Sequence, residues 1–414
     1  MDPIPLSLPF LMDGATGTEL QKRGMPLGAC TEQWALEHPE ALLELQRAYV
    51  EAGAQVLVTP TLGANRGALE KFGLADRVEE YNARLTGLTR QAAAGRALVA
   101  GDLGPTLHAI PPYGETPFEV LVGFYAEQAA ALERAGVDLF LVESVMAMAE
   151  ARAAVLGIRE SGSRRPILVT CYCDEEGRTP SGTDVLACAI VMQGMGVTAF
   201  GLNCVDPAVA EEQLARLHLY TDLPLIAEPS AGLPDLTSGK PDYPDNADAF
   251  ARRTPQWAAA GVRIFGGCCG TAPAHIAALG RAMAIVDFSA FPPVEKDPDV
   301  IPCASEKEAR FITPDVDVGE TIQCTDHLME DILEAEEERP VGALKIEVLD
   351  TDDLEIFARE QYAVRDALCL WSDVPELLEG ALRAYQGRAF YDGTAELEPE
   401  FLARMSEKYG LILL

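Results

Sequence analysis

Short apolar runs alternate with longer helical patterns eight times between residues 10 and 285. The runs are rich in Val, Ile and Leu and apolar at successive positions, as in strands that are buried on both faces. We expect these strands at residues 10–13, 55–59, 98–103, 139–143, 167–173, 199–204, 224–228 and 263–268. The main helical patterns lie at 39–52, 118–135, 146–159, 184–195, 207–218 and 247–260. Eight such units predict a closed (β/α)8 TIM barrel.

A doubly wound sheet is the rival fold, but it usually has fewer strands and a glycine-rich first turn. No G-x-G-x-x-G motif follows the first expected strand. In a (β/α)8 barrel the active site lies at the carboxyl ends of the strands, so the residues there should be reactive. They are Asp13, Thr59, Asp102, Glu143, Cys173, Cys204, Glu228 and the pair Cys268 and Cys269.

Three of these strand-end residues form a candidate metal centre. Cys204 ends the sixth expected strand, while Cys268 and Cys269 end the eighth, with only the seventh strand between them. Glycines flank the Cys–Cys pair and allow the sharp turn that would direct both sulfurs to one point. Three thiolates and one open position are typical of a catalytic zinc site, which lowers the pKa of a substrate thiol. A Cys–Cys pair alone is more often structural.

The composition argues against several classes of protein. The formal net charge of −33 disfavours binding to nucleic acid or to anionic lipid. No apolar run approaches about 20 residues, so we expect no membrane span. The short apolar segment 4–12 follows Asp2 and lacks a basic start and a cleavage site, so it does not indicate a signal peptide. We therefore expect a cytoplasmic protein whose ten cysteines are thiols or metal ligands.

Three stretches resemble one known family. Residues 11–20 read LMDGATGTEL, residues 201–204 read GLNC, and residues 266–271 read GGCCGT. In this order they resemble the homocysteine S-methyltransferase family, including the homocysteine-binding domain of cobalamin-dependent methionine synthase. The resemblance covers residues 8–285 and implies a (β/α)8 barrel with one Zn2+ on Cys204, Cys268 and Cys269. It also implies that a methyl group is transferred to zinc-bound homocysteine thiolate to make methionine.

Homocysteine carries an ammonium and a carboxylate that the site must also bind. Asp13 and Glu143 are our candidates for the ammonium, and the resemblance implies such a role for Glu143. Backbone N–H groups of Ala15 and Thr16, in the loop 14–18, are candidates for the carboxylate. The structural alternatives are a turn or helix cap for Asp13 and a salt bridge at the rim for Glu143.

Other polar residues near the strand ends are ambiguous. Asn203 either positions the zinc ligands or the substrate, or satisfies backbone groups. Glu228 and Pro60 depart from the family, which tends to have a neutral residue and Asn there, so they bear on which substrate is accepted.

Two further features have competing readings. Cys171 and Cys173 are read as a small apolar pair rather than a second metal site. His275 follows the Cys–Cys loop and has either a structural role or a role behind the metal ligands.

The character of the chain changes after residue 285. A proline-rich, charged stretch at 288–305 is read as a linker between a barrel at 1–287 and an acidic α/β domain at 306–414. Residues 291–414 hold 30 acidic and 11 basic side chains, which is −19 of the total charge of −33. Strands are expected at 343–349, 367–371, 389–391 and 411–414, and helices at 354–362, 374–385 and 400–409.

The second domain resembles the first half of the pterin-binding barrel of cobalamin-dependent methionine synthases. The resemblance rests on residues 381–388, ALRAYQGR, and on residues 408–410, KYG. Polar residues that hold a pterin in that family are replaced, with Leu349, Trp371 and Asp392 among the replacements, so we predict no folate binding. Half a barrel exposes apolar edges and must pack on the first domain, form a homodimer or meet a partner.

The sequence leaves the methyl donor open. No cobalamin-binding domain is recognised, and the remnant of a second barrel favours a methylated corrinoid on a separate protein as the donor. S-methylmethionine or betaine is the alternative. Two further hypotheses are a non-catalytic subunit that binds homocysteine or zinc, and an acceptor that is another thiol or a selenol.

Overall fold

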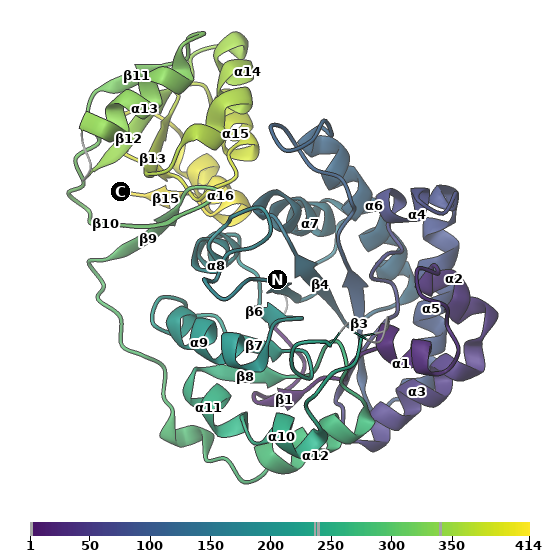
Figure 1. Cartoon of the computed structure of the whole chain (residues 1–414). Helices are drawn as coiled ribbons and strands as arrows, with labels where there is room; N and C mark the ends of the chain where they lie inside the picture. Colours follow the sequence, from purple (N-terminus) through teal and green to yellow (C-terminus); the bar gives the residue numbers. More distant parts are fainter. Residues whose placement is uncertain (1–2, 236, 238–240, 339–341) are drawn as a thin grey trace.

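The computed structural model describes residues 3–235, 237, 241–338 and 342–414. Its first part is a barrel of parallel strands surrounded by helices (Figure 1). The strands are β1 (Phe10–Leu11), β2 (Val56–Val58), β3 (Leu98–Leu103), β4 (Leu139–Val145), β5 (Ile167–Cys171), β6 (Ala199–Asn203), β7 (Leu225–Glu228) and β8 (Val262–Phe265). They pair in the order β1-β8-β7-β6-β5-β4-β3-β2. A parallel bridge between Met12 and Val56 brings the two end strands together, so the predicted barrel is confirmed.

Helices surround this sheet on its outer side. They are α1 (Gly17–Lys22), α2 (Thr31–Glu37), α3 (Pro39–Glu51), α4 (Arg66–Glu70), α5 (Val78–Ala93), α6 (Phe118–Ala135), α7 (Met148–Glu160), α8 (Val185–Gly194), α9 (Pro207–His218), α10 (Ala247–Ala251), α11 (Thr254–Ala259) and α12 (Pro273–Met283). The barrel interior is filled by a separate apolar cluster that includes Phe10, Leu141 and Ile264. Apolar residues on both faces explain why the strands read as unbroken apolar runs.

The second part is a parallel sheet in chain order, β11-β12-β13-β14-β15. Its strands are β11 (Thr321–Gln323), β12 (Ala343–Glu347), β13 (Ala367–Trp371), β14 (Phe390–Tyr391) and β15 (Ile412–Leu413). Helices α13 (Leu328–Glu338), α14 (Thr351–Glu360), α15 (Pro375–Ala384) and α16 (Pro399–Tyr409) alternate with the strands. The smaller α/β unit is therefore confirmed, while its exact boundaries stay a prediction.

An antiparallel hairpin precedes this sheet and packs against it. Strands β9 (Ile301–Ala304) and β10 (Ala309–Ile312) form the hairpin, so the last residues of the expected linker lie in a strand. Cys303 and Ile312 of the hairpin are buried against Ala343, Phe390 and Ile412 of the sheet. The hairpin thus covers apolar residues that half of a barrel would otherwise expose.

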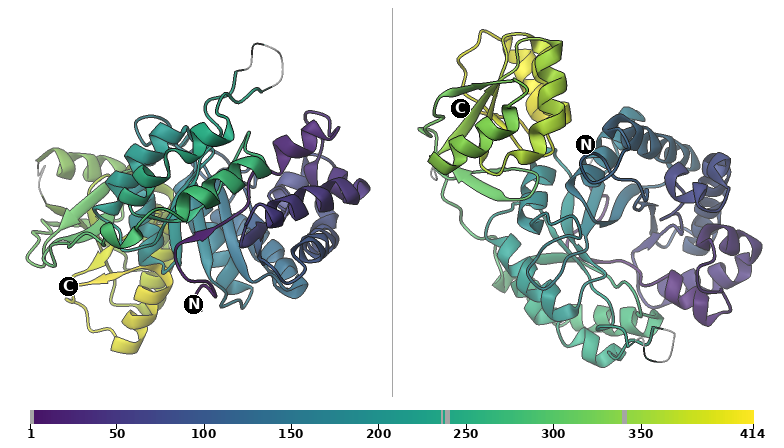
Figure 2. Two further views of the ribbon diagram at one scale, coloured as in Figure 1. Left: turned by 90° about the horizontal axis from the view of Figure 1, so that it is seen from below. Right: turned by 45° about the horizontal axis from the view of Figure 1, so that its top comes forward.

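The second unit docks on helices α7 and α8 of the barrel (Figures 1 and 2). All residues from Val185 to Met192 of α8 are buried, and this helix is apolar on every side. Arg152 of α7 is fully buried and donates hydrogen bonds to the carbonyl oxygens of Leu382 at 2.8 Å and Arg383 at 3.3 Å. Those carbonyls lie at the carboxyl end of α15, where backbone acceptors have no partner within the helix.

Short 3-10 turns complete the elements: η1 (Ala75–Arg77), η2 (Phe288–Ala290) and η3 (Gln361–Ala363). Among the helices that the structure describes, none has the length and apolar character needed to cross a membrane.

Candidate metal centre and substrate cavity

The three cysteines singled out in the sequence meet at one rim of the barrel. Cys204 directly follows β6, while Cys268 and Cys269 lie in the loop after β8. Their sulfur atoms all lie within 4.8 Å of one another, and this is the one such group of three or more His, Cys, Asp or Glu ligands found among the described residues. Cys171 and Cys173 therefore belong to no such group, and Cys171 instead contacts the buried Cys188 at 3.5 Å.

Backbone hydrogen bonds hold the three cysteines in place. Cys204 adopts a left-handed conformation with φ of 56°, and its N–H donates to the carbonyl of Glu228 at 3.1 Å. The N–H of Cys268 donates to Pro229 at 2.9 Å, and the carbonyl of Cys269 accepts from Ala231 at 2.9 Å. The segment after β7 thus bridges β6 and the Cys–Cys loop.

The three sulfurs lie close enough together either to bind one metal ion or to form a disulfide. The structure pairs Cys204 with Cys268 as a disulfide, and the sulfur of Cys269 lies 3.5 Å from that of Cys204. A sulfur in a disulfide has no thiolate to offer a metal, so the two states exclude each other. In the reduced state, three thiolates at one rim are the donor set that Zn2+ prefers. The residues present therefore fit zinc.

A cavity of about 210 Å³ opens beside the sulfurs. Five carboxylates line it, and the described lining residues include no lysine, arginine or histidine. The five are Asp13, Glu32, Asp102, Glu143 and Glu228. A cavity with this lining favours guests that carry positive charge.

Burial changes the titration of all five carboxyl groups. The pKa values of Asp13, Glu32, Asp102, Glu143 and Glu228 are raised, chiefly because burial disfavours the charged form. Repulsion from neighbouring carboxylates adds to this rise at Asp13, Asp102 and Glu228. One oxygen each of Asp102 and Glu228 is buried without a hydrogen-bond partner. Because an unpaired buried polar atom is costly, the protein alone leaves part of the hydrogen-bonding capacity of this cavity unused.

Asn203 connects the acidic part of the cavity to the cysteines. Its amide nitrogen donates to Glu143 Oε1 at 2.9 Å and to Ser144 Oγ at 2.7 Å, and it lies 3.9 Å from the sulfur of Cys268. Its amide oxygen accepts from the N–H of Ser144 at 3.2 Å. Of the two readings of Asn203, these contacts favour positioning of the site over satisfaction of the backbone alone.

Contacts of the loop after β1 bear on its expected role, which is to bind the ammonium and carboxylate of the substrate. Asp13 accepts the N–H of Val58 at 3.0 Å. The N–H of Ala15 donates to Thr271 Oγ1 at 3.1 Å, so it is already used. Thr16 stands at the start of α1 and lines the cavity, and its N–H remains the better candidate for a carboxylate.

Sequence reasoning passed over two residues at this site. Glu32 on α2 lines the cavity and accepts the N–H of Gly63 at 2.7 Å. The side chain of Tyr243, in the loop between β7 and α10, packs against Gly270, which directly follows Cys269. Neither residue ends a strand or belongs to a recognised motif, so only the folded chain brings them to the cysteines.

His275 proves to be part of the scaffold of that loop. Its Nδ1 accepts from the N–H of Ala272 at 3.1 Å, so the other ring nitrogen carries the proton and donates to the carbonyl of Asp245 at 2.9 Å. The structure thus favours a structural role for His275.

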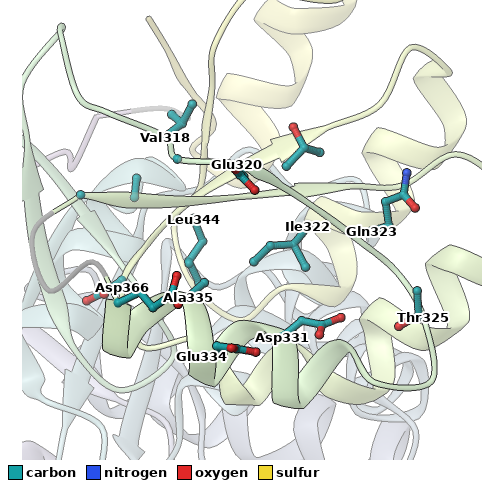
Figure 3. Close-up of a pocket in the computed structure, with 15 residues that line it drawn as sticks. Val318, Glu320, Ile322, Gln323, Thr325, Asp331, Glu334, Ala335, Leu344 and Asp366 are labelled. Atoms are coloured by element: carbon teal, nitrogen blue, oxygen red, sulfur yellow. The ribbon is translucent and has the colours of Figure 1, made fainter.

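Another cavity, of about 510 Å³, lies at the β11 edge of the second sheet (Figure 3). Its described lining includes Glu320, Asp331 and Glu334, with no cysteine or histidine. It has no counterpart to the metal-ligand set of the barrel.

Comparison with known proteins identifies the barrel. The sequence profile of the homocysteine S-methyltransferase family matches residues 10–283, which is most of the first unit. The chain belongs to the homocysteine S-methyltransferase family. The three cysteines and the cavity both lie within the matched part of the chain.

Individual members of the family agree with this assignment. Methionine synthases of Mycobacterium leprae and Mycobacterium tuberculosis are each 32% identical over 290 residues, covering 66% of this chain but 24% of their own length. The chain thus matches about a quarter of these relatives. The homocysteine methyltransferase MmuM from Escherichia coli, in its metallated form, is 29% identical with a TM-score of 0.55. That match covers 66% of this chain and 95% of MmuM, which has also been solved in oxidized and apo forms.

Proposed function

We propose that this protein is a zinc-dependent homocysteine S-methyltransferase that makes methionine. The observation that carries the proposal is the convergence of Cys204, Cys268 and Cys269 beside an acidic cavity. Three cysteine ligands leave one position open, which is the arrangement of catalytic rather than structural zinc sites. When bound there, zinc would lower the pKa of the homocysteine thiol, so that the thiolate is present at neutral pH.

The residues of the chain would bind and orient the amino acid. Glu143, fixed by Asn203, and Asp13 face the cavity and supply negative charge for the ammonium group. Thr16 lines the same cavity, and its N–H would bind the carboxylate. The homocysteine sulfur then attacks the methyl carbon of the donor. Its electron pair forms the new S–C bond, and the bond from the methyl to the donor breaks with its pair on the leaving atom.

Replacing Glu143 with glutamine should raise the KM for homocysteine about 10- to 100-fold, because a charge-assisted hydrogen bond worth about 1.5–3 kcal/mol is lost. The glutamine keeps the size of the side chain, so kcat should change less than KM. Steady-state kinetics with varied homocysteine would measure this split. Glu176→Gln, which changes an exposed glutamate of a neighbouring loop, is the matched control. An unchanged KM in Glu143→Gln would exclude Glu143 from the ammonium site.

For the donor, we propose a methylated corrinoid carried by a separate protein. The support is the relationship to methionine synthases, of which this chain covers about a quarter. The acidic cavity favours a second candidate, a small cationic donor of the S-methylmethionine or betaine type, because the described lining residues offer it no repelling cation. The alternative in which the protein is not an enzyme is a non-catalytic subunit that binds homocysteine or zinc.

A donor panel distinguishes these candidates. With homocysteine as acceptor, methylcobalamin should support methionine formation, because it presents the same methyl group as a protein-bound corrinoid. Turnover with S-methylmethionine or betaine but not with methylcobalamin would favour the cationic donor instead. Zinc binding without turnover on any donor would point to the non-catalytic subunit. Methyltetrahydrofolate should be inactive, and Cys269→Ala assayed in parallel shows which rates depend on the metal centre.

The remaining expectations also stay proposals. We propose a cytoplasmic protein that binds neither nucleic acid nor membranes, with domains at 1–287 and 306–414 and a homodimer through the second domain. Contacts between the two units favour a single packed arrangement. Two of the residues that replace pterin contacts have partners within the protein: Asp392 lies 2.5 Å from Lys345, and Trp371 donates to Thr394 at 2.8 Å. Such pairing supports the prediction that folate does not bind.

A further inference from the structure

The strand that carries Glu143 is irregular where it meets the cavity. The register of β4 with β5 shifts between Val142 and Val145, so Glu143 and Ser144 form a bulge in which two residues oppose one residue of β5. Ser144 adopts a left-handed conformation with φ of 60°, which is costly for a residue other than glycine. Both residues line the cavity. Bulges beside active sites direct side chains in this way, and this one presents Glu143 to the cavity.

The bulge is held from two sides. Asn203 holds it from the side of the cavity through hydrogen bonds to both of its residues. On the other side, Met146 directly follows the strand, and its carbonyl accepts the N–H of Ser181 at 3.2 Å. Ser181 belongs to the loop 172–184 between β5 and α8. Because a strained conformation persists only where its surroundings fix it, the position of this loop affects the shape of the bulge.

The second unit reaches the same loop through the turn of its hairpin. Lys307, between β9 and β10, donates from Nζ to the carbonyl of Ser181 at 2.8 Å. The carbonyl of Lys307 accepts from the N–H of Asp184 at 2.9 Å and from Arg178 at 3.0 Å. Arg178 also pairs with Glu308 of the turn at 2.9 Å. Both backbone and side-chain contacts therefore join the hairpin turn to the loop after β5.

The charged end of Lys307 is enclosed in this position. Its side chain is 19% exposed, and Nζ lies 2.7 Å from Oε1 of Glu306, whose side chain is 5% exposed. The Nζ atom also lies 4.5 Å from the centre of the ring of Tyr113, which belongs to the loop after β3. An ammonium with this little exposure needs such partners, and they fix where it lies. Lys307 thus sits between the loops after β3 and β5, on the face of the barrel where the strands end at the cavity.

We propose that Lys307 is a positioning residue for the homocysteine site, and that the hairpin of the second unit supports the bulge that presents Glu143. The contacts run from Lys307 through Ser181 to Met146, which lies three residues after Glu143 in the chain. This rests on the proposed function, which assigns Glu143 to the ammonium of homocysteine. The second unit then has a role at the active site that does not depend on folate.

Lys307→Met tests this role, because it removes the ammonium and keeps most of the length of the side chain. Hydrogen exchange in peptides covering residues 139–148 should become about 2- to 30-fold faster, the range for a residue that acts through a chain of contacts. Lys408→Met is the matched control, since Lys408 also pairs with a glutamate, Glu379 on α15 of the same unit, at 2.8 Å. Lys307→Arg keeps a charged donor and should restore slow exchange.

Steady-state kinetics supply the second measurement. The KM for homocysteine should rise about 2- to 30-fold in Lys307→Met, with kcat changed less, because the bulge carries the ammonium ligand and no metal ligand. Unchanged exchange at 139–148 overturns the proposal, whatever the kinetics show. Faster exchange with an unchanged KM also overturns it, as does equal acceleration in peptides throughout the barrel. If the wild-type protein does not act on homocysteine, the proposed function fails, while the exchange data still decide whether Lys307 supports the bulge.

Discussion

Cys269→Ala is expected to lose both the metal and the methyl transfer activity. The wild-type protein should carry about one zinc ion per chain, held by three sulfurs. Loss of a group that merely supports a ligand costs about 10- to 100-fold in affinity or activity, so loss of a ligand itself should cost more. Zinc content by mass spectrometry of the purified, reduced protein and methionine formation are the two measurements.

Cys173→Ala is the matched control for this experiment. Cys173 is also buried near a strand end, but it lies outside the three-sulfur group, so its replacement should retain zinc. The measurements need a reductant, because a disulfide between Cys204 and Cys268 would remove two ligands at once. If reduced Cys269→Ala kept full zinc and full activity, the proposed metal centre would be wrong.

Arg152→Met should destabilise the protein by about 3 kcal/mol, the second large effect we expect. The guanidinium is fully buried between the two units, where burial lowers its pKa to about 10, so it remains charged at neutral pH. It donates to the carbonyls of Leu382 and Arg383 and to Gln386 Oε1 at 3.3 Å. Methionine fills part of the space but leaves these acceptors buried and unpaired.

Urea unfolding followed by circular dichroism would measure the loss in Arg152→Met. Arg164→Met changes an exposed arginine just after α7 and should stay within about 0.5 kcal/mol of wild type. A loss of less than about 1 kcal/mol in Arg152→Met would mean that the interface does not depend on this residue. The unfolding curve would also show whether the two units unfold together or in separate steps.

The sequence predicted the regular parts of the fold well, for identifiable reasons. The expected helix bounds 118–135 and 207–218 agree with α6 and α9. Gly136 in a left-handed conformation ends α6, and Pro207 begins α9, so strong local signals mark these ends. The expected helix 247–260 instead divides into α10 and α11, because Pro255 lies in the first turn of a new helix that begins at Thr254.

Elements that depend on distant contacts were missed or misjudged. The hairpin β9–β10 begins within a proline-rich, charged stretch, and its strands are stabilised by the sheet that follows them in the chain. The unbroken apolar run of α8, by contrast, is the sequence pattern of a helix that is covered on both sides.

The expectation that reactive residues follow the carboxyl ends of the strands identified the three cysteines. Their exact positions, however, are set by the loops. The expected eighth strand extends to residue 268, whereas β8 ends at Phe265 and the two cysteines lie in the loop beyond it. Backbone bonds from the segment after β7 fix them there, and no sequence pattern encodes those bonds. The packing of Tyr243 against Gly270 is of the same kind.

The acidic cavity has a consequence for the stability of the folded protein. Five buried carboxyl groups with raised pKa values share a space whose described lining holds no cation, so folding brings together groups that disfavour each other. A guest with an ammonium group relieves that conflict as it binds. The site therefore trades stability of the fold for affinity toward a cationic guest.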